Sequence, residues 1–221
     1  MINEKNTTVI ICAAGMGTRL GTGATKALLK LDGKSLIARQ LEMLESYDDI
    51  RVVVGFQAEK VIEEVNKIRK DITFAFNYDY KTTGPAESLY KALFKARENV
   101  IALDGDLLIA PDDFARFSAA EDECIGYTKR ISSEPIGITV DKGFVTGFGE
   151  NRAQYEWAGV MKIKSSKLLK EKSYVYKMLE PSLPLKGMEM RVIDIDTIDD
   201  YEAAYKWIKS DYSHKAYQRS V

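Results

Sequence analysis

The sequence predicts an α/β protein of one domain, built on a mainly parallel, mixed sheet with helices on both faces. Strand-like and helix-like patterns alternate along the first half of the chain and are joined by short links, which implies right-handed crossovers between parallel strands. After about residue 120, short strands and turns follow one another, which adds a small, partly antiparallel region. With 221 residues, the chain can bury a core without a disulfide or a structural metal.

The first half of the chain contains a regular series of predicted elements. Continuous apolar runs, typical of strands buried on both faces, lie at 8–14, 50–55, 72–76 and 100–106. Apolar residues recur at helical spacing at 35–46, 61–68 and 85–96. Pro85 suits the first position of the third helix, because the N–H that it lacks would have no partner there. The inner face of that helix would be formed by Leu89, Leu93 and Ala96.

The second half is predicted to contain shorter elements. Strands are expected at 124–129, 136–140, 143–148, 157–163 and 190–196. Helical pieces are expected at 165–172 and 175–179, and a closing helix at 199–209. On that closing helix, one face would carry Tyr201, Ala204, Tyr205 and Ile208.

Composition excludes several classes of protein. The 32 Lys and Arg residues nearly balance 33 Asp and Glu, so nothing favours binding to nucleic acid or to an anionic membrane surface. No apolar run approaches the ~20 residues that span a bilayer, and no signal-peptide core follows the polar N-terminus. Two cysteines make no disulfide framework, so a cytoplasmic protein is expected. With His214 as the one histidine, catalysis or metal binding through His is not expected.

The most informative segment is the glycine-rich loop AAGMGTRLGTGATKALLKL at residues 13–31. It leaves a buried strand and combines four glycines with two cations, Arg19 and Lys26. Glycine lets a ligand approach the backbone closely, and successive exposed N–H groups form a cradle for an anion. The carboxyl end of the first strand in an open α/β sheet is where a phosphate-bearing ligand binds.

The pattern of this loop distinguishes between classes of phosphate site. The dinucleotide pattern GxGxxG fails because Leu20 occupies the third glycine position, and GxxxxGK[ST] fails in every register. The run matches GxGTR…K, in which the loop wraps a triphosphate and the Arg and Lys neutralise it. An ordinary flexible loop is the alternative, but it would leave the two cations after a buried strand without a reason.

Carboxylates follow two of the predicted strands. Asp104 and Asp106 lie at i, i+2 at the end of 100–106, on the same side if the chain stays extended. Two such oxygen donors facing a phosphate loop suit Mg²⁺, which uses one or two carboxylates together with phosphates and water. The segment IDIDT offers a second pair, Asp194 and Asp196, of which Asp196 is alternatively the N-cap of the closing helix, a role that Thr197 could equally take.

A third group of residues could bind an acceptor molecule. Tyr155, Glu156 and Trp157 precede a late strand, and aromatic faces with a carboxylate suit a cationic head group. The alternative is that these aromatic rings pack against the core or against a second copy of the chain. Lys129 and Lys142 could reach an acceptor phosphate, or could be ordinary solvated surface lysines.

The loop resembles the signature of the nucleotidyltransferases that make sugar nucleotides and related compounds, including the MobA-like NTP transferases. The resemblance continues in order through KALLKLDGKSLI, VVVG, TGPAESLYKAL, ALDGD and IDIDTIDDY, and is weaker over residues 107–190. It implies a Rossmann-like nucleotidyltransferase fold, an NTP substrate and Mg²⁺. It also implies a nucleotide-binding half at 1–120 and an acceptor-binding half at 121–221.

The resemblance assigns site residues at the matching positions. The nucleotide contacts that it implies, with Arg19 and Lys26 also as catalytic cations, are Ala13, Ala14, Gly15, Met16, Gly17, Thr18, Arg19, Lys26, Gly84, Pro85, Ala86, Ser88 and Asp104. Asp106 is the metal ligand that it singles out, and the resemblance implies that Asp194 or Asp196 completes the site, with Asp194 favoured. Glu87, near the start of the same helix as Ser88, is added to the expected acceptor contacts.

The expected reaction is transfer of NMP, with CMP favoured, from an NTP to a small phosphorylated or phosphonate acceptor, with release of pyrophosphate. The length and the segment SLYKAL resemble small phosphocholine and 2-aminoethylphosphonate cytidylyltransferases. No proline precedes Lys26 and the glycine loop is short, which leaves base and acceptor open, including sugar-1-phosphate and molybdopterin acceptors. Further alternatives are a glycosyltransferase that uses Asp104 and Asp106 as a DxD motif, and a non-catalytic nucleotide-binding subunit. A homodimer is a further candidate assembly.

Overall fold

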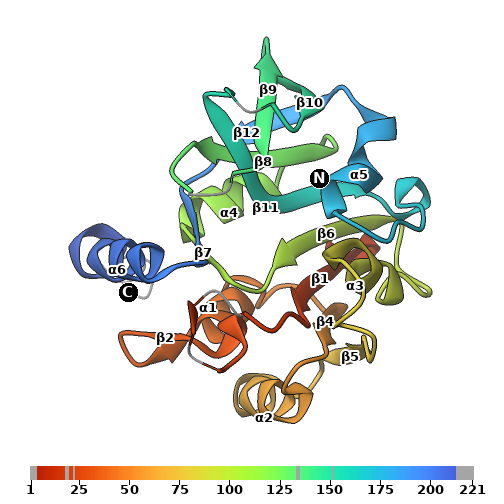
Figure 1. The fold of residues 1–221 in the computed structure, drawn as a ribbon. Helices are drawn as coiled ribbons and strands as arrows, with labels where there is room; N and C mark the ends of the chain where they lie inside the picture. Colours follow the sequence, from red (N-terminus) through yellow and green to blue (C-terminus); the bar gives the residue numbers. More distant parts are fainter. Residues whose placement is uncertain (1–3, 18–19, 22, 133–134, 151, 213–221) are drawn as a thin grey trace.

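The computed structural model describes residues 4–17, 20–21, 23–132, 135–150 and 152–212. Its main sheet runs in the order β5-β4-β1-β6-β11-β8-β12-β10-β9 (Figure 1). These strands are β1 (Thr7–Ala13), β4 (Ile50–Val54), β5 (Thr73–Phe76), β6 (Asn99–Asp104), β8 (Cys124–Lys129), β9 (Gly137–Asp141), β10 (Phe144–Phe148), β11 (Tyr155–Lys164) and β12 (Leu185–Glu189). Smaller two-stranded ladders are β2 (Lys30–Leu31) with β3 (Lys34–Ser35), and β7 (Leu107–Ile109) with β13 (Val192–Asp194).

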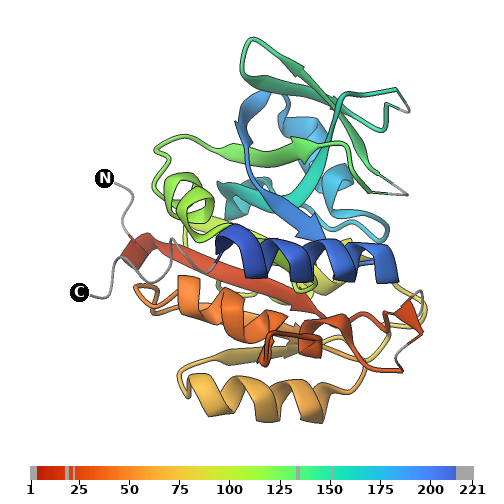
Figure 2. The ribbon, with the colours of Figure 1, turned by 90° about the vertical axis from the view of Figure 1, so that its left-hand side faces the viewer.

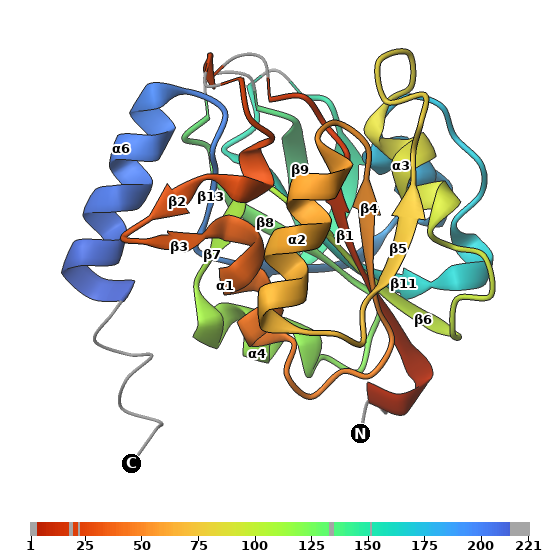
Figure 3. The ribbon, with the colours of Figure 1, turned by 90° about the horizontal axis from the view of Figure 1, so that it is seen from below.

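Helices cover both faces of the sheet, as the sequence predicts. They are α1 (Leu36–Met43), α2 (Ala58–Ile68), α3 (Pro85–Lys91), α4 (Pro111–Ser118), α5 (Val175–Leu179) and α6 (Ile198–Trp207). Because strand side chains alternate, Val9 and Ile11 of β1 join a core with α1, α2 and α4, whereas Ile10 joins a second core with α3 and α5. Figure 3 shows α1 and α2 on one side of the sheet and α3 on the other.

The two halves of the chain use different strand pairing. β5, β4, β1 and β6 are parallel, and β11 then joins β6 in the antiparallel direction. Beyond it, β8, β12, β10 and β9 follow in order, and β9 returns to pair with β11. Five strands of the second half therefore close on themselves above the parallel strands (Figure 1). The mixed sheet of the prediction is confirmed.

The last helix connects the second half back to the first. Figure 2 shows α6, in dark blue, lying along one side of the molecule. Ala204 and Ile208 are buried there, and the Tyr201 hydroxyl donates to the Lys30 carbonyl at 3.0 Å. Tyr205, expected on the same inner face, is 41% exposed. The buried face of α6 is therefore narrower than the face that the sequence predicts.

Other predictions of local structure are wrong in detail. The expected helix 165–172 is only a 3₁₀ turn at Ser165–Lys167. Helix α3 ends at Lys91, so Leu93 and Ala96 lie beyond it, although both still pack against the core. The short elements β2, β3, β7, α4 and β12 were not predicted, although the proline and two aspartates at the start of α4 are a recognisable helix-start signal. In the described part of the chain, no helix is long and apolar enough to cross a bilayer.

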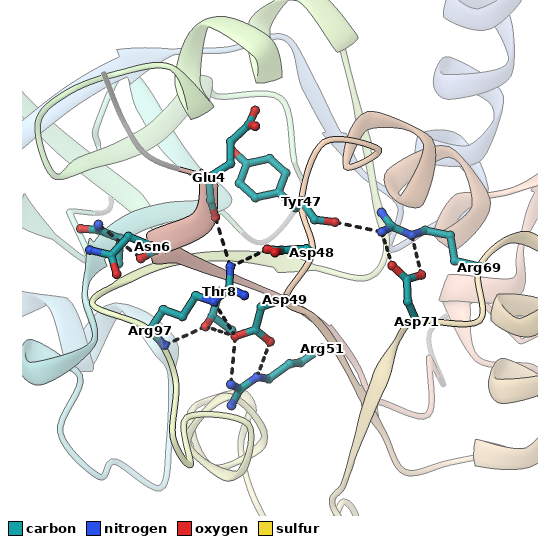
Figure 4. A network of polar contacts seen from close by, with 11 residues as sticks. Glu4, Asn6, Thr8, Tyr47, Asp48, Asp49, Arg51, Arg69, Asp71 and Arg97 are labelled. Atoms are coloured by element: carbon teal, nitrogen blue, oxygen red, sulfur yellow. Dashed lines mark hydrogen bonds and ion pairs between the residues drawn. The ribbon is translucent and has the colours of Figure 1, made fainter.

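A network of polar contacts closes the amino-terminal end of the parallel strands (Figure 4). The Arg51 guanidinium pairs with both oxygens of Asp49, at 3.0 and 3.1 Å. It also donates to three carbonyls in the chain that follows α3, those of Ala92, Phe94 and Lys95. Asp49 in turn accepts from the Thr8 hydroxyl at 2.6 Å, so one ion pair ties together β1, β4 and the end of α3.

A second arginine performs the same task beside it. Arg69, after α2, donates to the carbonyls of Leu44 and Tyr47 and pairs with Asp71 (Figure 4). The backbone carbonyls after the end of α1 have no partner within the helix, and the charged Arg69 side chain donates hydrogen bonds to them. Both networks lie at the end of the sheet opposite the carboxyl ends of β1 and β6, so they are structural.

Replacing Arg51 tests this network. We expect Arg51→Ala to lower the free energy of unfolding by ~2–4 kcal/mol, because it removes the ion pair of the shielded Asp49 carboxylate and the charged donor to three carbonyls. Lys67→Ala is the matched control, since Lys67 forms ion pairs but its side chain is 60% exposed. The control should change stability by less than ~0.5 kcal/mol in urea unfolding. Equal effects of the two substitutions would contradict the assignment.

Candidate active site

A cavity of about 740 Å³ lies at the carboxyl ends of β1 and β6. Residues from both halves of the chain line it. From the first half these are Cys12, Ala13, Ala14, Gly15, Gly17, Thr25, Lys26, Ala27, Tyr80, Thr83, Gly84, Pro85, Ser88, Asp104, Gly105 and Asp106. From the second half they are Thr128, Ser132, Pro135, Ile136, Gly149, Glu156, Trp157, Ala158, Tyr174, Tyr176, Val192, Asp194 and Asp196.

The start of the glycine loop folds over Lys26. Gly17 has a φ of +58°, and a Cβ at this position would lie 2.7 Å from Cγ of Lys26. Glycine is therefore needed here both for the backbone conformation and for the close approach. Met16 does not line the cavity, and Thr18 and Arg19 lie outside the described residues.

Gln57 holds the far end of the loop, a contact that the sequence analysis missed. Its side-chain amide donates to the Gly23 carbonyl at 2.9 Å and accepts from the Thr25 N–H at 3.3 Å. Gln57 itself is in the left-handed region, with a φ of +51°, between β4 and α2. The part of the loop immediately before Lys26 is thus hydrogen-bonded to the turn between β4 and α2.

The centre of the site is an ammonium group among carboxylates. Nζ of Lys26 lies 2.9 Å from Oδ2 of Asp106 and forms a second ion pair with Asp196. Burial lowers the pKa of this lysine, but the charges of Asp106 and Asp194 and the two hydrogen bonds outweigh it, so the net pKa is raised. Lys26 is therefore charged, and its charge compensates part of the negative charge around it.

Three of the carboxylates form a group that fits a divalent cation. One oxygen from each of Asp106, Asp194 and Asp196 lies within 4.8 Å of the others. Asp194 opens to the cavity, and loss of solvation together with Asp106 and Asp196 raises its pKa well above the usual range. Clustered hard oxygen donors of this kind suit Mg²⁺. Both candidates for the second acidic ligand lie in the group.

The helix-cap alternative for Asp196 is wrong. Thr197 is the N-cap of α6, and it exchanges hydrogen bonds with Asp200 in a capping box. The Asp196 side chain is thereby left to pair with Lys26. Asp194 ends β13, whose pairing with β7 carries it to Leu107, directly after Asp106.

Asp104 has a different environment from Asp106. The chain turns at Gly105 after β6 ends, so the two side chains do not follow an extended i, i+2 arrangement, and that expectation is wrong. Asp104 accepts a hydrogen bond from Trp157. Burial and the charge of Asp106 raise the pKa of Asp104 to about 7. It lines the cavity but stands outside the group of three carboxylates.

Aromatic rings form the wall contributed by the second half. Phe148 contacts Trp157 at 5.7 Å and Tyr176 at 5.4 Å between ring centroids, and Tyr174 stacks on Tyr176 at 5.5 Å. Trp157, Tyr174 and Tyr176 line the cavity. Trp157 was predicted and the two tyrosines were not, although the repeat Tyr-Val-Tyr at the start of α5 was a visible signal.

The other predicted acceptor residues are placed differently. Glu156 lines the cavity and is 4% exposed, but its carboxylate accepts from the N–H groups of Ile131 and Ser132 and from the Ser132 hydroxyl. Tyr155 packs against Tyr127, with ring centroids 4.9 Å apart. Neither Tyr155 nor the exposed lysines lines the cavity; those lysines are Lys129 at the end of β8 and Lys142 in the β9–β10 turn.

The predicted base contacts at the start of α3 divide into two groups. Gly84, Pro85 and Ser88 line the cavity, whereas Ala86 is buried in the core and Glu87 is not part of the lining. The segment before α5 crosses here: the N–H of Gly84 donates to the Lys172 carbonyl at 3.0 Å. A Cβ on Gly84 would lie 2.0 Å from the Ser173 carbonyl oxygen, so only glycine permits this crossing.

The fold and the site agree with a comparison against known families. The model of the MobA-like NTP transferase domain matches residues 9–136, which include the glycine loop, Lys26 and both acidic residues after β6. The chain belongs to this family. This match confirms the resemblance that the glycine loop indicates.

Curated relatives of the transferase include the bifunctional protein GlmU. The protein from Aliarcobacter butzleri is 34% identical over 147 residues, which are 65% of this chain and 34% of the relative. The protein from Bifidobacterium adolescentis is 29% identical over 143 residues, which are 63% of this chain and 30% of the relative. The match thus spans about a third of the length of these relatives.

Solved structures share the fold over nearly the whole chain. CTP:phosphocholine cytidylyltransferase from Streptococcus pneumoniae has a TM-score of 0.75 at 20% identity, covering 92% of this chain and 99% of its own. The inositol-1-phosphate CTP transferase from T. maritima has 0.75 at 18%, covering 93% and 97%. HddC from Yersinia pseudotuberculosis, complexed with GMP-PN, has 0.71 at 20%, covering 90% and 98%. At these identities the likeness establishes the fold.

A substitution at Gly84 tests whether the start of α3 and the segment before α5 are in contact. Gly84→Ala should lower the free energy of unfolding by ~1–3 kcal/mol, because the new methyl group overlaps the Ser173 carbonyl and forces the two segments apart. Gly147→Ala is the matched control, since the nearest atom to its Cβ would be 3.8 Å away. Urea unfolding measures both variants. A Gly84→Ala protein as stable as the control would show that the two segments are not in contact.

Proposed function

We propose that this transferase moves CMP from CTP to a small acceptor bearing a phosphate or phosphonate, with release of pyrophosphate. The observation that carries the proposal is one cavity in which the glycine loop and Lys26 lie beside three carboxylates. The aromatic wall of the second half completes this cavity. We assign the nucleotide to the half at 1–120 and the acceptor to the half at 121–221.

The reaction needs positioning and charge neutralisation rather than a proton acceptor. An oxygen of the acceptor phosphate attacks the α-phosphorus of the NTP and forms the new P–O bond. The bond between the α-phosphorus and the bridging oxygen breaks, and pyrophosphate leaves with the electron pair. The attacking oxygen is already ionised at neutral pH, so no general base is required.

Each part of the cavity has a role in this scheme. Loop N–H groups from Ala13 to Gly17, with Lys26, would bind the triphosphate, and we assign Arg19 to the same task. Asp106, Asp194 and Asp196 would hold Mg²⁺. When bound there, Mg²⁺ would neutralise negative charge on the phosphate oxygens. Since Lys26 already pairs with two of these carboxylates, it is held next to the place where the phosphates would lie.

The aromatic wall supports an acceptor with a cationic head group, such as phosphocholine or 2-aminoethylphosphonate. Trp157 and Tyr176 both line the cavity, and aromatic ring faces attract ammonium groups. Glu156 adds negative charge behind them, although its oxygens are engaged by the 131–132 backbone. Sugar 1-phosphates are the second class of acceptor, because sugar rings also pack on aromatic faces.

A pyrophosphate-release screen tests the proposed reaction. It crosses CTP, UTP, ATP and GTP with phosphocholine, 2-aminoethylphosphonate, inositol 1-phosphate and glucose 1-phosphate in the presence of Mg²⁺. We expect turnover with CTP and one acceptor, and its loss by at least ~100-fold in Asp106→Asn, since a carboxylate at the phosphates is removed. Asp141→Asn, exposed at the end of β9, is the matched control. No pyrophosphate with any pair, or full activity of Asp106→Asn, would refute the proposal.

Tyr176 tests the acceptor wall separately. Tyr176→Ala should raise KM for a cationic acceptor about tenfold, because a ring contact with a cation is worth ~1–2 kcal/mol when water is excluded. KM for the nucleotide should stay within about twofold. Phe144→Ala, which removes an aromatic ring that is 47% exposed on β10, serves as control. An equal rise in both KM values would contradict a role of Tyr176 in acceptor binding.

A further inference from the structure

Gln40 is a polar residue at the centre of a buried helix face, and the proposed reaction does not use it. It lies on α1 and is 0% exposed. Ile37, Leu41 and Leu44 follow the same face at helical spacing, and all three belong to the apolar core. An amide buried among apolar side chains costs free energy unless its polar atoms are hydrogen-bonded. The contacts of Gln40 therefore decide what it does.

The amide group of Gln40 spans the turn that carries Asp106. Its Nε2 donates to the Asp104 carbonyl at 2.9 Å and to the Leu107 carbonyl at 3.1 Å. These carbonyls lie on either side of Asp106, at the end of β6 and the start of β7. Helix α1 packs against β7, which brings the amide to this turn (Figure 3). Both hydrogens of the Nε2 group are thereby used on one turn.

The Oε1 atom of the same amide gains nothing from its position. It is shielded from solvent and accepts no hydrogen bond from any residue that the structure describes. Rotating the amide by half a turn would place this oxygen against two carbonyl oxygens, so the orientation is fixed. A buried acceptor without a donor lowers stability. An apolar side chain would avoid that loss, so what glutamine contributes here is its two donors.

Two other segments hold the same turn. The Gly105 N–H donates to the Cys12 carbonyl of β1 at 2.9 Å, and a Cβ on Gly105 would lie 2.8 Å from that oxygen. The Asp106 carbonyl accepts from the Ile195 N–H at 3.2 Å. Together with the glutamine amide, these contacts give every residue from 104 to 107 a backbone partner outside the turn. The direction in which Asp106 leaves the backbone is therefore set by three neighbouring segments.

We propose that Gln40 is a positioning residue for divalent-cation binding, which holds the turn after β6 so that the Asp106 carboxylate stays within the group of three carboxylates. This rests on the proposed function, in which these carboxylates hold Mg²⁺. Gln40 does not line the cavity, so it acts through the backbone of the turn. Hydrogen bonds that fix the orientation of a metal ligand contribute to the affinity of the site for the metal. Without the two donors, the turn and its carboxylate would be held from two sides only.

A pair of methionine substitutions tests this role. Gln40→Met removes both donors, and its unbranched apolar side chain suits the buried face of α1. Lys162→Met is the matched control: Lys162 is 3% exposed and lies outside the cavity lining. Its Nζ also donates to two carbonyls, those of Ser118 and Ala120, at 3.0 and 2.6 Å. Thermal melting establishes that the variants are folded, and Gln40→Leu replaces Gln40→Met if methionine is not tolerated.

The measurement is binding of Mn²⁺ followed by electron paramagnetic resonance, with a non-hydrolysable CTP analogue present and the analogue alone as reference. We expect Gln40→Met to weaken Mn²⁺ binding ~10-fold and Lys162→Met to stay within about twofold of wild type, since only the first loosens a metal ligand. Wild-type affinity in Gln40→Met, or equal weakening in both variants, overturns the inference while the proposed function stands. Wild type that binds no Mn²⁺ beyond the analogue alone refutes both.

Discussion

The arrangement of the cavity depends on one buried ammonium group. Lys26 pairs with Asp106, 80 residues further along the chain, and with Asp196, 170 residues further. Without a cation, Asp106, Asp194 and Asp196 would repel one another at these separations. The glycine loop, the turn after β6 and the start of α6 therefore meet because a positive charge lies between them. The same electrostatic requirement supports our proposal that the cavity takes an anionic substrate together with a divalent cation.

The parallel half of the sheet has two ends with different tasks. At the amino end, Arg51 and Arg69 use all their contacts on carboxylates and carbonyls that the structure itself supplies. At the carboxyl end, backbone and side-chain groups face a cavity instead. Structural rigidity at one end and open hydrogen-bonding capacity at the other are what a binding site on an α/β sheet requires.

Much of this could be predicted, because it is encoded locally. The apolar run of β1 and the glycine loop that follows it predict the fold class and one wall of the cavity from one continuous segment. The carboxylates after β6 and β13 were likewise visible as short motifs. Contacts between distant segments were not visible: Trp157 meets Asp104, and the segment before α5 crosses the start of α3, only through strand order and long-range packing. Glu156 was predicted as an acceptor contact from its sequence position, but its carboxylate accepts hydrogen bonds from the backbone of a neighbouring loop. That contact was not visible in the sequence either.

In our proposal the glycine loop and the three carboxylates bind the triphosphate and a divalent cation together. The decisive measurement is a crystal structure with a non-hydrolysable CTP analogue and Mn²⁺, in which an anomalous difference map locates the manganese. We expect one manganese peak among the carboxylates of Asp106, Asp194 and Asp196, with the triphosphate over Ala13–Gly17 and beside Lys26. A nucleotide bound elsewhere, or manganese at other residues while this cavity holds neither, would contradict it.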